Sequence, residues 1–194
     1  MWRATVAAAV LALVGGPAFA TEANCLLMQM TEGQKEAVRT AYVAGGIRAV
    51  ANAAELTLEQ VAPCIGSPST DKEWSDAGFR VGIAFSATRR EFATGEFLTR
   101  KYGLPPQSLD VAWERLSPED RSTLRSIVAL PAREGAHAEQ GVIDEVYLAA
   151  LERLAVAAGI TGRADRPSAN PDFKVVLDHY IARAVREEAE ATFR

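Results

Sequence analysis

The chain has 194 residues, of which 48% are hydrophobic and 24% charged, and its formal net charge is −4. A chain of this length usually folds as one domain and can bury a full core. Mild acidity without any long basic run excludes nucleic-acid binding and binding to anionic membrane surfaces, because both need clustered Lys and Arg.

The first twenty residues predict a secretory signal peptide. Arg3 supplies one positive charge, residues 4–16 are small and apolar, and Ala18-Phe19-Ala20 places small side chains where signal peptidase needs them. We therefore expect cleavage between Ala20 and Thr21, with residues 21–194 forming a single helical domain. A short, lightly charged signal of this kind is typical of Gram-negative secretion, so the sequence predicts a periplasmic protein.

No membrane-spanning helix is expected. About 20 apolar residues are needed to cross the hydrocarbon core, and the apolar run of the signal peptide is shorter than that. Lipidation of Cys25 is an alternative route to a membrane, but it requires a Leu-like residue three positions earlier, where the chain has Glu22. The carboxylate makes this a poor lipidation site.

The two cysteines, Cys25 and Cys64, are predicted to form a disulfide. An even cysteine count in an exported chain favours pairing, because the compartment is oxidising. A zinc site would need more ligands than these two residues and distant histidines supply. A redox-active pair would have the spacing Cys-x-x-Cys, which is absent.

Helix-start signals recur along the chain, and strand signals do not. Capping boxes begin at Thr31, Thr57 and Thr70, and Ser117 and Asn170 each precede a proline at a first helical position. These signals predict a compact, all-α, single-domain bundle of about six to seven helices with one disulfide. The expected helices are 32–54, 58–65, 71–94 with an extension to 102 left open, 107–116, 118–130, 138–158 and 171–191.

Two of these helices have patterns that predict their place in the bundle. Helix 71–94 carries apolar groups on two sides, with Phe79 and Ile83 opposite the main stripe, so we expect it to be central and covered on both faces. Helix 171–191 has one apolar face, with His179, Arg183 and Arg186 outside it. This pattern predicts a surface helix with an exposed His179. Gly45-Gly46 is expected to bend the first long helix.

Few residues in the sequence are placed for catalysis or metal binding. The only histidines are His137 and His179. Glu134 and His137 have the Glu-x-x-His spacing of di-iron bundles, but a second copy is absent because Val176 stands three residues before His179. Asp178 and His179 could join a Ser–His–Asp arrangement, yet no Gly-x-Ser-x-Gly elbow supports one. We therefore assign no catalytic residue, no metal site and no cofactor.

Paired carboxylates and three arginines remain as candidates. The acidic pairs Glu119-Asp120, Asp144-Glu145 and Glu187-Glu188 are neighbours about 100° apart on a helix, which favours solvated faces over a glycosidase pair. The arginines beside the apolar stripes of helix 71–94 could bind an anionic ligand. The candidate residues for such a site are Arg80, Arg89 and Arg90, with Trp74 and Trp113 as aromatic neighbours.

The sequence favours a non-enzymatic, exported module that binds an envelope protein or a small ligand. The alternative is an envelope hydrolase that acts on glycan through an Asp/Glu pair. A pocket in which two carboxyl groups face each other, with one desolvated, would favour the hydrolase. The identity of the ligand or partner and the oligomeric state are left open by the sequence.

Overall fold

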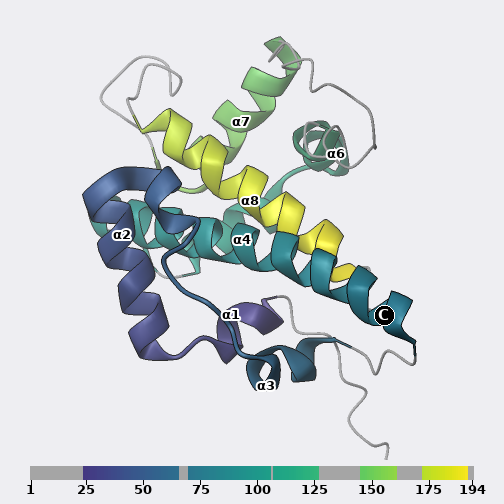
Figure 1. Ribbon diagram of the computed structural model, residues 1–194. Coiled ribbons are helices and arrows are strands. Elements are labelled where there is room, and N and C mark those ends of the chain that lie inside the picture. Colours follow the sequence, from purple (N-terminus) through teal and green to yellow (C-terminus); the bar gives the residue numbers. More distant parts are fainter. Residues whose placement is uncertain (1–23, 66–69, 106, 127–144, 161–171, 192–194) are drawn as a thin grey trace, which may run out of the picture.

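The computed structural model describes residues 24–65, 70–105, 107–126, 145–160 and 172–191, and in these ranges the chain is helical without strands (Figure 1). The predicted all-α class is therefore confirmed. No helix in these ranges has both the length and the apolar character needed to cross a membrane. The elements are α1 Cys25–Gln29, α2 Glu32–Val50, α3 Leu58–Val61, the 3₁₀ turn η1 Ala62–Cys64, α4 Asp71–Tyr102, α5 Ser108–Arg115, α6 Pro118–Ser126, α7 Glu145–Ala157 and α8 Phe173–Ala191.

The fold is organised around α4 and α8, which lie side by side along much of their length (Figure 1). Helix α4 begins at the predicted capping box of Thr70 and Glu73 and ends at Gly103, whose φ of 61° is left-handed. Its 32 residues span about 48 Å at 1.5 Å per residue. The open question of an extension to residue 102 is settled in favour of one long helix.

Helix α2 packs on α4 and carries the predicted bend. Gly46 has φ 64° and ψ −155°, a backbone conformation outside the helical region that a residue with a Cβ rarely adopts. The helix ends at Val50, four residues before the predicted end, and an irregular segment connects it to α3. The capping boxes of α2 and α3 are both present, and their glutamines, Gln34 and Gln60, hydrogen-bond to each other at 3.0 Å.

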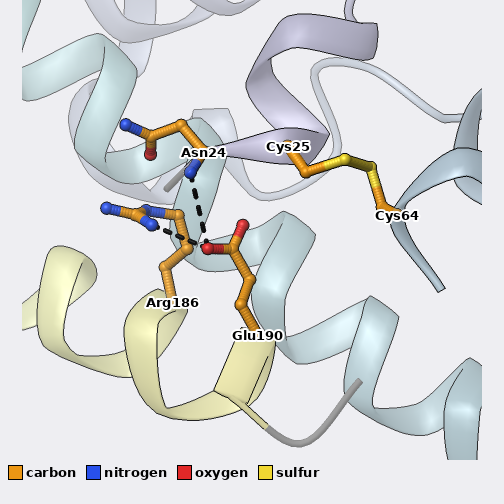
Figure 2. Close-up of a disulfide and its surroundings, with 5 residues drawn as sticks. All are labelled: Asn24, Cys25, Cys64, Arg186 and Glu190. Carbon is orange, nitrogen blue, oxygen red and sulfur yellow. Dashed lines mark hydrogen bonds and ion pairs between the residues drawn. A yellow bond between two sulfur atoms is a disulfide. The ribbon is translucent and has the colours of Figure 1, made fainter. Parts of the chain in front are cut away.

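A short helix that we did not predict, α1, packs on α4. Leu26 and Met30 are buried, and the disulfide between Cys25 and Cys64 ties α1 to η1 (Figure 2). The predicted disulfide is therefore present in the structure. Around it lies an apolar cluster that includes Leu26, Val38 and Phe85.

A second apolar cluster occupies the other end of the fold, where α5, α6 and α7 pack with α8 and the end of α4. It includes Leu98, Trp113, Leu151 and Tyr180, with Trp113 and Tyr180 stacked at 5.6 Å between ring centroids. The predicted end of helix 118–130 and the predicted start of helix 138–158 lie outside the described residues.

Two packing expectations are wrong. Helix α8 is central, and His179, Arg183 and Arg186 are buried against α4 and α5, because carboxylates and carbonyls there complete their hydrogen bonds. On α4, the face with Phe79 and Ile83 is only partly covered by the described elements, and Phe79 is 72% exposed.

Candidate functional site

A buried arginine joins α8 to α4 and to the start of α1. Arg186 is 0% exposed, and its guanidinium binds both carboxylate oxygens of Glu91, with Nε donating to Oε2 at 2.6 Å. Its Nη1 donates to Oε2 of Glu190 at 2.8 Å, and the backbone N–H of Asn24 also reaches this oxygen (Figure 2). Burial alone would lower the pKa of Arg186, but the hydrogen bond and charge of Glu91 raise it on balance.

A second arginine on α8 repeats this arrangement one turn earlier. Arg183 donates to Asp110 of α5 at 2.7 Å and to Glu187 at 3.2 Å. Burial opposes the charge of Arg183, but Glu91 and Asp110 outweigh it and raise the pKa of this arginine. Both arginines are therefore fixed in place by carboxylates from the neighbouring helices.

The imidazole of His179 lies on the same face of α8 and is held through one nitrogen. Its Nδ1 is 3.0 Å from the carbonyl oxygen of Glu91 and 3.1 Å from Oγ1 of Thr94. A carbonyl can only accept, and the Thr94 hydroxyl donates to the carbonyl of Arg90 at 2.7 Å. Both neighbours of Nδ1 therefore act as acceptors, which assigns the proton to Nδ1.

The other nitrogen, Nε2, is left with a lone pair. It is buried and has no hydrogen-bond partner among the described residues. Burial lowers the pKa of His179, against the opposing charge of Glu91 and with help from the charge of Arg183, so the imidazole is neutral at pH 7. A buried acceptor that lacks a donor is costly, and such a group needs a partner such as an ordered water or a ligand.

His179 lines a pocket of about 200 Å³ at the place where the two apolar clusters meet. Four elements form the walls: α1, α4, α5 and α8. The volume lies below the range of about 300–1,000 Å³ that is usual for drug-sized ligands, so a small ligand is expected. The lining residues are Asn24, Leu27, Thr88, Glu91, Phe92, Gly95, Glu96, Thr99, Leu109, Asp110 and His179.

Gly95 allows the imidazole to lie close to α4. A Cβ at this position would be 3.1 Å from Cε1 of His179, closer than ordinary van der Waals contact. Any larger residue would therefore press on the ring and require it to shift by a few tenths of an ångström.

The neutral, buried state of His179 predicts a specific pH dependence of stability. An unfolded histidine has a pKa of about 6.5, whereas the folded imidazole resists protonation, so acidification from pH 7 to pH 5 favours the unfolded state by up to about 2 kcal/mol. Urea unfolding at both pH values should show this loss in the wild type and not in H179N. An equal loss in both proteins would contradict it, and H137N isolates any contribution of the other histidine.

A separate apolar groove of about 500 Å³ lies between α2, α4 and α8. Phe79 and Ile83 line it, together with Arg90 and Asp178. Burial raises the pKa of Asp178, against the charges of Lys174 and Arg90. The groove therefore combines the exposed apolar side chains of Phe79 and Ile83 with one basic and one acidic residue, Arg90 and Asp178.

The three arginines predicted as an anion site are not brought together. Arg80 donates to the carbonyl of Asp76 on its own helix, and Arg90 lines the groove. Arg89 is buried, donates to the carbonyl of Ala54 and lies over the ring of Phe85 at 4.5 Å, and burial lowers its pKa. The Trp113 ring is core, and the Glu134/His137 motif lies outside the described residues.

The described residues contain no cluster of three or more His, Cys, Asp or Glu side chains that could hold a metal ion. Of the predicted acidic pairs, Asp120 is bound by Arg153 and Glu187 by Arg125 and Arg183, whereas Asp144 lies outside the described residues. The pocket residues Glu91, Asp110 and His179 were not predicted as a site.

Comparison with known proteins adds no assignment, because the chain matches no protein-family model, no curated protein and no solved structure.

Proposed function

We propose that the protein is an exported, non-enzymatic binding module of the cell envelope that takes a small ligand in the pocket between α1, α4, α5 and α8. The observation that carries the proposal is that His179 lines this pocket, while its buried Nε2, an acceptor, has no partner among the described residues. The signal-peptide pattern and the Cys25–Cys64 disulfide support export to the periplasm.

Binding is better supported than hydrolysis by an acidic pair. Glycosidases need two carboxyl groups facing each other about 5–10 Å apart, one of them kept protonated. In the pocket, Glu91 and Asp110 are each bound by a buried arginine. Burial raises the pKa of Asp178 and of Glu190, but these residues are twelve positions apart on α8, about 18 Å along its axis.

An envelope protein is the second candidate partner. Phe79 and Ile83 support it, because both expose apolar surface in the groove of α4. This surface lies apart from the pocket, so the two candidates are separable by experiment.

The pocket predicts that G95A weakens binding of a small ligand and that G82A does not. A Cβ at Gly95 would press on the His179 ring, whereas a Cβ at Gly82 meets nothing within 4 Å, and both glycines lie in α4. Small cationic, neutral and anionic fragments, among them methylammonium, acetamide, imidazole and glycolate, should be titrated while the ¹⁵N resonance of His179 Nε2 is followed. We expect at least one fragment to shift this resonance in the wild type and in G82A, and less in G95A.

Two results would contradict the proposed function. One is that no fragment of the panel shifts the Nε2 resonance at millimolar concentration. The other is that fragments bind with equal affinity to the wild type and to G95A, since binding would then occur elsewhere. H137N assigns the two histidine signals, because the chain has only two histidines.

A further inference from the structure

The pocket is lined by carboxylate residues and other hydrogen-bond acceptors. Three carboxylate residues line it, Glu91, Glu96 and Asp110, and the lining contains no Lys or Arg among the described residues. The arginines that pair with these acids are not among the lining residues: Arg183 and Arg186 belong to α8, Arg39 to α2 and Arg100 to α4. A ligand in the pocket would therefore meet carboxylates rather than guanidinium groups.

The hydroxyl groups in this part of α4 also have their protons directed away from a ligand. Thr99 donates to the carbonyl of Gly95 at 2.8 Å, and Thr88 donates to the carbonyl of Ala84 at 2.8 Å. Each hydroxyl therefore keeps lone pairs but has already used its only proton. These two lining residues add acceptors and no donor.

Besides the carboxylates and the hydroxyl groups, the imidazole of His179 is a third kind of acceptor in the lining. The Nδ1 proton is used on the carbonyl of Glu91, so Nε2 offers only a lone pair. Among the lining side chains, the amide of Asn24 is the one that can act either as a hydrogen-bond donor or as an acceptor. The polar part of the wall thus selects a ligand that brings its own N–H groups.

The remaining lining is apolar and limits the size of the ligand. Leu27, Phe92 and Leu109 provide this part of the wall. Because the pocket holds only about 200 Å³, there is room for a charged head group and a short hydrocarbon chain. We propose, on the basis of the proposed ligand-binding function, that the pocket binds a small organic cation, a primary ammonium ion whose N–H groups donate to His179 Nε2 and the carboxylates.

Three probes of equal chain length test this proposal: butan-1-amine, which is an ammonium ion at pH 7, butan-1-ol and butyrate. Each is titrated into the oxidised mature protein while the Nε2 resonance of His179 is followed. We expect the ammonium ion to bind about tenfold more tightly than the alcohol, because its hydrogen bonds are charge-assisted. Butyrate should bind most weakly.

A matched pair of variants separates a contact with the ligand from a general change of charge. Asp110 and Glu187 both pair with Arg183, but only Asp110 lines the pocket. D110N should weaken binding of butylammonium by about tenfold, the loss of one charge-assisted hydrogen bond, whereas E187Q should leave it nearly unchanged. If D110N does not fold by circular dichroism, E96Q with E36Q as its control provides the same comparison, since both acids pair with Arg39 and only Glu96 lines the pocket.

The outcomes distinguish this inference from the proposed function. Equal or tighter binding of the alcohol or of butyrate overturns the cation and leaves the pocket as a ligand site. Equal losses in D110N and E187Q overturn the direct contact with Asp110. If none of the three probes shifts the Nε2 resonance but another fragment does, the cation proposal is overturned and the proposed function stands.

Discussion

Replacing Arg186 by methionine should cost the fold about 3–5 kcal/mol in free energy of unfolding, the usual penalty for removing one partner of a buried ion pair. The arginine is 0% exposed and neutralises two carboxylates, Glu91 and Glu190. Without it, Glu91 remains buried with a negative charge beside the neutral imidazole of His179. Urea unfolding followed by circular dichroism measures the loss.

A control and a rescue make the cause identifiable. Arg153 binds Asp120 with its side chain 55% exposed, so R153M should cost less than about 1 kcal/mol. Adding E91Q and E190Q to R186M removes the uncompensated charges and should recover part of the loss. An R186M protein as stable as R153M, or a triple variant less stable than R186M, would contradict a buried ion-pair network.

The positions of the helices could be predicted where the signals are local. Each of the capping boxes at Thr31, Thr57 and Thr70 spans only four residues of sequence, and each one starts a helix in the structure. Gly46 likewise acts on its own backbone, and the predicted bend is present. Helix α1 was missed because five residues do not form a stable helix alone, and burial of Leu26 and the disulfide hold it.

The candidate site could not be predicted, because His179, Arg183 and Arg186 were assigned to a solvated surface. Burial of Arg186 depends on Glu91, which is 95 residues away in the sequence, and burial of Arg183 depends on Asp110, 73 residues away. A single sequence does not reveal such pairs. The available signal was spacing, since His179, Arg183, Arg186 and Glu190 recur every three or four residues and therefore share one face of α8.

The shared face explains why the pocket and the buried network occur together. Polar groups between two apolar clusters must be satisfied by one another, and the arginines achieve this with carboxylates from three elements. Only the Nε2 of His179 on this face, and Oε1 of Glu190, have no partner among the described residues. Binding of a donor at Nε2 would stabilise the whole network, so a ligand should also raise the melting temperature.

Loss of the disulfide is the second change with a large expected effect. Cys25 and Cys64 are 39 residues apart, and closing a loop of this length stabilises a protein by about 4 kcal/mol in the chain-entropy model. The C25S/C64S variant should lose a large part of this amount, measured by urea unfolding. Helix α1 should be the first element to exchange its amide protons, because burial of Leu26 and Met30 and the hydrogen bonds of Asn24 and Gln29 would then be its remaining anchors.

The same change should weaken ligand binding, because Leu27 of α1 and Asn24, the residue that precedes α1, line the pocket. Wild type treated with dithiothreitol should match C25S/C64S in both stability and affinity for butylammonium, and the reductant should not affect the variant. Equal unfolding midpoints for the oxidised wild type and the variant would show that α1 is held by packing alone. A variant with lowered stability and unchanged affinity would show that α1 braces the fold but does not shape the pocket.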